Sequence, residues 1–166
     1  MTSKKLEIIA EPGNTSFTTR RVVDAPRALV FEAFTKPEHL KRWMGPRNLT
    51  MVVCDSEFRV GGRYRFVLRA PNGQEAGFSG EFREIVPPER IVRTFVFDPY
   101  PDAEALETLQ LDERDGQTTI TTTTLHKNVE SRARIARRVG SASAPNVAFR
   151  SCSAFIASAI HNLSYT

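Results

Sequence analysis

Apolar and polar residues alternate along most of the chain between residues 17 and 125, and this alternation is the pattern of half-buried β-strands. The clearest stretch is residues 63–69, where Tyr64, Phe66 and Leu68 would share one face of a strand and arginines the other. Turn-forming clusters such as Pro71-Asn72-Gly73 separate the alternating stretches. Seven strands are therefore predicted, at residues 17–23, 49–55, 63–69, 76–85, 90–97, 104–112 and 117–125.

Between the first two strands the apolar spacing becomes helical. Asp24-Ala25-Pro26 predicts a helix start, because the carboxylate can accept hydrogen bonds from first-turn amides and proline needs no acceptor there. Thr35-Lys36-Pro37-Glu38 predicts the start of a second, shorter helix, which Gly45-Pro46 ends. The inward positions of the two helices are predicted to be Val30, Ala33, Phe34, Leu40, Trp43 and Met44.

The order of these elements, β-α-α-β-β-β-β-β-β-α, predicts an α+β fold, since the strands follow one another through short turns and the helices are segregated. Residues 1–15 contain Glu11-Pro12-Gly13-Asn14 and are expected to be a flexible N-terminal leader. Residues 16–166 are expected to form a single domain, in which residues 127–166 are an atypical basic segment.

The formal net charge of +4 at pH 7 is concentrated in that segment, which holds six basic residues and one acid, Glu130. The body of the chain is nearly neutral, so no nucleic-acid partner is expected. No apolar run reaches the roughly 20 residues that a membrane span needs, and the N-terminal residues do not predict a secretory signal. Cys54 and Cys152 are isolated from each other, which excludes a disulfide scaffold and favours a cytoplasmic location.

Candidate catalytic and metal-binding chemistry is sparse. His39, His126 and His161 fall in no metal-ligand spacing, and no nucleophile, phosphate-loop or dinucleotide motif occurs. Neither a metal nor another cofactor is therefore expected.

Several segments occur together in a familiar order: Phe17-Thr18-Thr19-Arg20-Arg21, Trp43-Met44-Gly45-Pro46, Gly61-Gly62-Arg63-Tyr64-Arg65 and residues 80–91. They resemble the bacterial members of the activator of heat shock protein 90 ATPase homologue-like family, in the START-like (SRPBCC) superfamily. The resemblance covers about residues 5–126, and Met44 stands where many relatives have a second tryptophan. It implies a helix-grip fold, in which a curved seven-stranded antiparallel sheet surrounds a long C-terminal helix and a hydrophobic cavity. Superfamily members use this cavity for lipids, polyketides and plant hormones.

Aromatic side chains of the predicted strands are the candidate walls of such a cavity, although an ordinary packed sheet core would show the same alternation. Arg93 shares strand parity with Ile91 and Phe95, so an inward guanidinium would need an acidic partner or an anionic ligand. The candidate cavity residues are Trp43, Tyr64, Phe66, Leu68, Phe78, Phe82, Arg93, Phe95, Phe97 and Gln110.

The leading functional expectation is a monomer or homodimer that binds a small hydrophobic ligand without catalysis. One alternative is a polyketide cyclase- or dehydratase-like enzyme. The other is a chaperone-associated protein, since eukaryotic members of the family bind heat shock protein 90 and stimulate its ATPase.

The C-terminal segment departs from the family pattern after Lys127. Residues 130–139 are helical in propensity but rich in arginine, and Phe149, Cys152, Ile156 and Leu163 follow at helical spacing. Either this segment closes the sheet, or a reading-frame change has replaced the usual long helix.

Overall fold

Eight antiparallel strands form one sheet in the computed structural model, which describes residues 7–44 and 49–140. Their spatial order is β1-β2-β8-β7-β6-β5-β4-β3. The strands are β1 (Glu7–Ile9), β2 (Ser16–Val23), β3 (Thr50–Ser56), β4 (Arg63–Arg69), β5 (Glu75–Val86), β6 (Arg90–Phe97), β7 (Tyr100–Arg114) and β8 (Gln117–His126). The helices are α1 (Arg27–Thr35), α2 (Pro37–Trp43) and α3 (Val129–Gly140).

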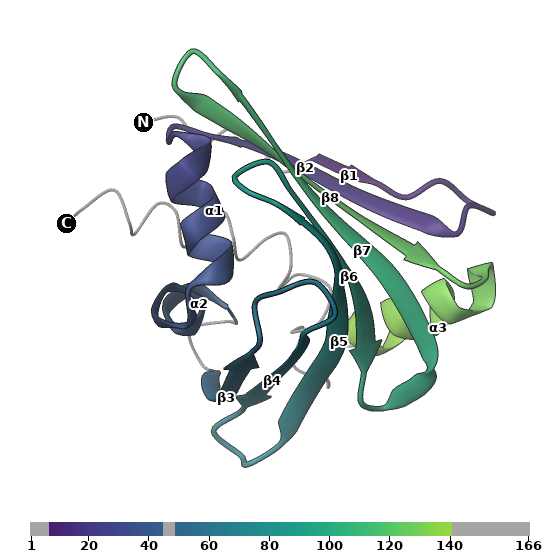
Figure 1. Cartoon of the computed structure of the whole chain (residues 1–166). Helices are drawn as coiled ribbons and strands as arrows, with labels where there is room; N and C mark the ends of the chain where they lie inside the picture. The colour runs from purple at the N-terminus through teal and green to yellow at the C-terminus, as the bar shows by residue number, and fades with distance from the viewer. Residues whose placement is uncertain (1–6, 45–48, 141–166) are drawn as a thin grey trace.

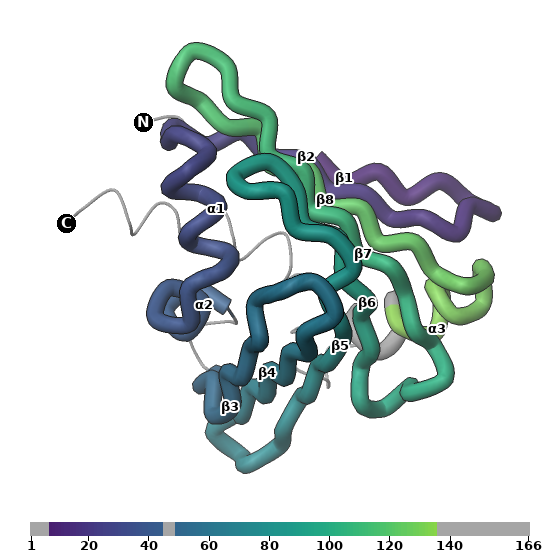
Figure 2. Tube along the Cα trace, viewed as in Figure 1, coloured from purple at the N-terminus to yellow at the C-terminus, as the bar shows by residue number. Residues whose placement is uncertain are grey.

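The sheet bends strongly, and α1 and α2 lie inside the bend (Figure 1). The Cα trace shows the β3–β4 hairpin turning away from the β2 and β8 arm of the sheet, with the two helices between them (Figure 2). Strands β3 to β7 are each paired with the next strand along the chain, and β8 also pairs with β2. The chain passes from β2 on one side of the sheet to β3 at the opposite edge through α1 and α2, which explains why these helices span the bend.

The seven predicted strands are confirmed, and an eighth, β1, joins them at the edge. Residues Glu7–Ile9 pair with Thr18–Arg20 of β2, so the expected leader over residues 1–15 includes a strand, and the expected sheet was one strand short. Three residues are too few to show an alternating pattern. The strand exists because β2 offers unpaired backbone groups at the edge of the sheet.

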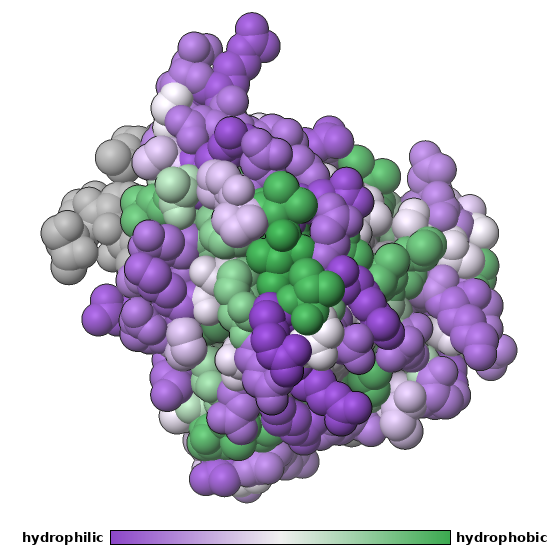
Figure 3. Space-filling model, in the orientation of Figure 1, coloured by the Kyte–Doolittle hydropathy of each residue, from purple (hydrophilic) through white to green (hydrophobic). Residues whose placement is uncertain are grey.

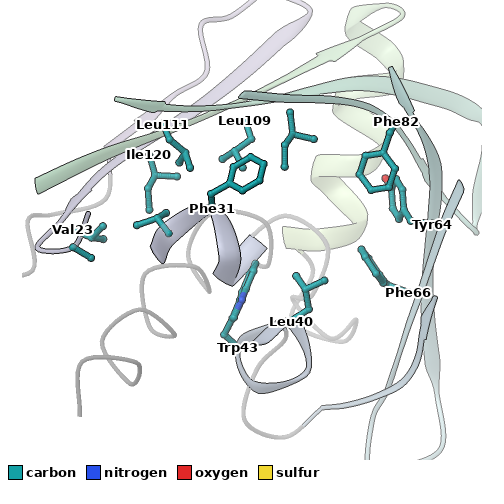
Figure 4. Close-up of a cluster of buried hydrophobic side chains, with 13 residues drawn as sticks. Val23, Phe31, Leu40, Trp43, Tyr64, Phe66, Phe82, Leu109, Leu111 and Ile120 are labelled. Carbon is teal, nitrogen blue, oxygen red and sulfur yellow. The ribbon is translucent and has the colours of Figure 1, made fainter. Parts of the chain in front are cut away.

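Alternate side chains of the strands point to the concave side, where they form two apolar clusters. The helix-pair cluster lies under α1 and α2, and Figure 4 shows its helix side chains facing those of the sheet. Its described members are Val23, Ala25, Val30, Phe31, Leu40, Trp43, Tyr64, Phe66, Phe82, Ile91, Leu109, Leu111 and Ile120. The α3 cluster gathers around Ile135, and its other members are Leu68, Ala76, Phe78, Phe95, Phe97, Ala103 and Ala105.

The start of α1 differs from the sequence prediction. Pro26 is the N-cap, and no side chain of the cap residue bonds to the first turn. The amide of Arg27 instead donates a hydrogen bond of 2.9 Å to Glu113 Oε2 from β7, while Asp24 accepts a bond from the Gln117 side chain. The first amide of α1 is therefore satisfied by a strand that lies far away in the sequence.

The helix predicted over residues 130–139 is confirmed as α3. The second helical segment expected at residues 149–163 lies outside the described residues. No helix in the described part of the chain is long and apolar enough to cross a membrane.

Candidate functional site

A pocket lies between α2 and the concave side of the sheet. Its free volume is about 30 Å³, which is room for about two water molecules. Both helices and four strands contribute to its wall. The described lining residues are Phe34, Leu40, Trp43, Met44, Phe82, Ile91, Arg93, Glu107, Leu109 and Thr122.

An ion pair is the main polar feature of this wall. Arg93 on β6 and Glu107 on β7 stand directly opposite each other in the strand register. Arg93 donates from Nε at 2.7 Å and lies with Nη2 at 2.5 Å from the same carboxylate oxygen, Oε1 of Glu107. The two side chains are only 15% and 6% exposed. The inward arginine expected from strand parity therefore has an acidic partner.

Tyr64 supports this ion pair from the neighbouring part of the sheet. The guanidinium carbon of Arg93 lies 4.7 Å from the centroid of the Tyr64 ring, within the range of a cation–π contact. The Tyr64 hydroxyl donates a 2.7 Å hydrogen bond to the Thr94 carbonyl. Gly80 makes this arrangement possible, because a Cβ there would lie 1.9 Å from the Thr94 oxygen and 2.7 Å from a Tyr64 ring carbon.

Trp43 forms the helix side of the pocket and joins the two helices. Its indole Nε1 donates a buried hydrogen bond of 2.6 Å to the Ala33 carbonyl of α1. Its ring also meets Phe34 edge to face, with 5.3 Å between centroids. Leu40 and Trp43 are buried and Met44 is half-buried, so the predicted inward positions of α2 face the pocket.

The sequence-predicted site residues fall into four groups in the structure. Trp43, Phe82 and Arg93 line the pocket. Tyr64 and Phe66 lie next to it in the helix-pair cluster. Leu68, Phe78, Phe95 and Phe97 belong to the α3 cluster. Gln110 lies between the buried Leu109 and Leu111 on β7, so its side chain points to the opposite, convex side, and we leave it out of the site.

Seven of the described lining residues were not among the predicted site residues, and the charged one of these seven is Glu107. It occupies the inward register of β7 together with Ala105, Leu109 and Leu111, all of which are buried. The sequence does show Glu107 among the apolar alternate positions of one strand and Arg93 among those of the preceding strand. This signal could not be used without the pairing of β6 and β7, which only the fold provides.

Burial also affects ionisable side chains outside the pocket lining, among them the buried His126 and the half-buried Cys54. His126 is 3% exposed, and neither ring nitrogen has a hydrogen-bond partner among the described residues. Burial, together with the nearby positive charge of Arg132, lowers the pKa of His126 to about 4. Burial raises the pKa of the Cys54 thiol. No group of three or more metal-ligating side chains occurs in the described ranges.

A bent antiparallel sheet that holds helices in its concavity, with a pocket between them, defines the helix-grip class of START-like proteins. The sequence profile described as "Activator of Hsp90 ATPase homolog 1-like protein" matches residues 24–144, more than half of the chain. The chain therefore belongs to this family, as the resemblance predicted. No curated protein matches the sequence.

Solved structures of bacterial proteins share the fold. A Rhodobacter sphaeroides protein is 26% identical, with 98% of this chain and 100% of that chain covered and a TM-score of 0.77. A Chromobacterium violaceum protein is 30% identical, with 66% and 77% covered and a TM-score of 0.60. A Mycobacterium smegmatis protein is 17% identical, with 95% and 94% covered and a TM-score of 0.78, and it supports the fold alone.

The family match also corrects the expected limit of the resemblance. The match continues beyond Lys127 and through α3 to residue 144, so the prediction that the family pattern ends near residue 126 was wrong. The reading-frame hypothesis stays a prediction for residues 145–166, which lie outside the described residues.

Proposed function

We propose that this chain is a cytoplasmic binding protein for a small, largely apolar molecule, held between α2 and the concave side of the sheet. The observation that carries the proposal is the Arg93–Glu107 pair, an almost fully buried ion pair in an otherwise apolar pocket wall. A few placed polar groups in an apolar cleft are the usual composition of a small-molecule site.

The ion pair is not readily explained by stability alone. Removing two charges from water is expensive, and well-packed apolar residues in place of a buried pair are often equally stable or more stable. Seven of the described lining residues are apolar, so the strands could have completed the same cluster without charges. A binding role accounts for the pair, because it gives an apolar ligand one fixed polar contact.

The pocket is too small to hold a ligand unless part of its wall moves. About 30 Å³ is far below the roughly 300–1,000 Å³ of a typical ligand site, so the ligand must displace part of the wall. The sheet side is held by the pairing of β6 with β5 and β7, whereas α2 is a seven-residue helix. Binding is therefore expected to move α2 outward together with α1, to which the Trp43 indole is hydrogen-bonded, and to leave the strands in place.

Native mass spectrometry of the protein purified from its own host tests this proposal. A small molecule that co-purifies with the wild-type chain is expected, and Leu109→Phe, which narrows the pocket, should lose it. Leu106→Phe is the matched control, because Leu106 is on the same strand but is exposed on the other face. Absence of any bound molecule, or equal retention by both variants, would contradict the proposal.

Contact with a chaperone is a second candidate, favoured by exposed apolar side chains near one end of the sheet. Phe58 and Val60 lie between β3 and β4 and Val86 ends β5, and Figure 3 shows apolar surface in the region of these connections. Single exposed apolar residues are ordinary, but a group of them is typical of a protein contact. This candidate predicts that the chain stimulates the ATPase of a bacterial heat shock protein 90 and that Val60→Ser reduces the effect. Val52→Ser, at another exposed valine, should not reduce it.

A further inference from the structure

The two charges of the described pocket lining have opposite signs. Arg93 and Glu107 are the charged residues among its described lining, and they stand opposite each other on adjacent strands. The other described lining residues are uncharged, and Thr122 is the one with a hydroxyl group. A ligand group that reaches this wall therefore meets a positive and a negative side chain at similar range.

An anionic ligand gains little from Arg93 in this setting. Its charge would be stripped of water and brought close to the Glu107 carboxylate, which repels it. Displacing Glu107 from the guanidinium would not help, because a carboxylate that is only 6% exposed would then be left without its partner. An uncharged ligand avoids both costs.

The hydrogen bonds within the pair indicate which uncharged group fits. Nε and Nη2 of Arg93 both lie within 2.7 Å of Oε1 of Glu107. A carboxylate has two oxygen atoms, each able to accept more than one hydrogen bond, and it has no proton to donate when ionised. The complementary ligand group is therefore a donor that reaches Oε2.

We infer that the ligand is an uncharged apolar molecule with a hydroxyl group, and that the pocket selects against carboxylates. This inference rests on the proposed binding function.

Three probes with the same ring system separate hydrogen-bond donation from charge. Naphthol has a hydroxyl donor, its methyl ether lacks the donor, and naphthoate carries a negative charge. Trp43 is the single tryptophan of the chain and lines the pocket, so one indole N–H signal in the NMR spectrum reports binding there. Naphthol is expected to bind about tenfold more tightly than the ether and than naphthoate, the size of one charge-assisted hydrogen bond.

Two variants assign the selectivity to the ion pair. Glu107→Gln removes the negative charge and should raise naphthoate affinity about tenfold. Glu104→Gln is its control on the same strand, since Glu104 is exposed on the opposite face. The double variant Arg93→Met, Glu107→Leu removes both charges together, which protects the fold against an unpaired buried arginine. In this double variant the preference for naphthol over its ether should disappear.

The outcomes separate the inference from the function on which it rests. Tighter binding of naphthoate than naphthol by the wild-type chain, or an unchanged hydroxyl preference in the double variant, would overturn the inference and leave the binding function standing. If none of the three probes shifts the indole signal, the proposed function fails and the inference fails with it.

Discussion

At the residue scale, His126 shows how position alone sets the chemistry of a side chain. Its ring lies at the end of β8 on the inward register and has no hydrogen-bond partner among the described residues. The charged form is disfavoured there, both by burial and by Arg132, so the pKa falls from 6.5 to about 4. In the unfolded chain the imidazole regains its ordinary pKa.

This difference predicts a loss of stability in mild acid. Above pH 6.5 the ring is neutral in both states and contributes nothing to the pH dependence; as the pH falls toward 4, the unfolded state takes up the proton and the folded state does not. The free energy of unfolding should therefore fall by roughly 2–3 kcal/mol across this window through His126 alone. Urea unfolding of the wild type and His126→Leu at several pH values measures this share.

The variant should lack that part of the decline and should be at least as stable as the wild type near neutral pH, because it removes unsatisfied buried nitrogens. His39→Gln on α2 is the comparison, since His39 is only half-buried, with one unpartnered ring nitrogen where His126 has two. An identical pH dependence in wild type and His126→Leu would contradict the prediction.

At the element scale, the start of α1 depends on a partner from another strand. Glu113 accepts the hydrogen bond of the Arg27 amide, whereas first-turn amides are usually satisfied by the side chain of the N-cap residue. Glu113→Ala should lower the free energy of unfolding by about 1 kcal/mol, the usual effect of losing a cap. Thermal unfolding of this variant beside Asp24→Ala checks the assignment. A larger loss in Asp24→Ala would show that the residue predicted from the sequence is the cap after all.

The sequence predicts single elements better than it predicts the contacts between them. The strands Arg63–Arg69 and Arg90–Phe97 were predicted to the residue, because alternation of apolar and polar side chains is a local property of a half-buried strand. The Glu113 cap and the Arg93–Glu107 pair could not be predicted, since each joins residues of different elements and depends on strand register. The facing of Gln110 could not be decided from the sequence for the same reason, because the alternation of β7 had not been tied to its neighbouring strands.

At the scale of the whole molecule, the concave side is divided between two apolar clusters with different tasks. The helix-pair cluster contains the pocket wall, whereas the α3 cluster around Ile135 is separate from the described lining. Ile135→Ala and Leu40→Ala should each lower the free energy of unfolding by about 2–4 kcal/mol, because both side chains are nearly fully buried.

Only one of these changes should reach the pocket. Leu40→Ala enlarges the lining and is expected to alter naphthol affinity in the indole titration, while Ile135→Ala should leave it unchanged. Measuring the free energy of unfolding and the naphthol affinity of each variant separates a residue's effect on stability from its effect on ligand binding. An equal effect of the two changes on affinity would show that the clusters act as one.

The hydrogen bond between the Trp43 indole and the Ala33 carbonyl also constrains how a ligand can enter. Displacing α2 alone would break this buried bond and leave a donor and an acceptor unsatisfied, so moving both helices as one body is the less costly route. Such a concerted step is slower than diffusional encounter. Association kinetics should then level off at high ligand concentration, at a ceiling set by the joint motion of the helix pair.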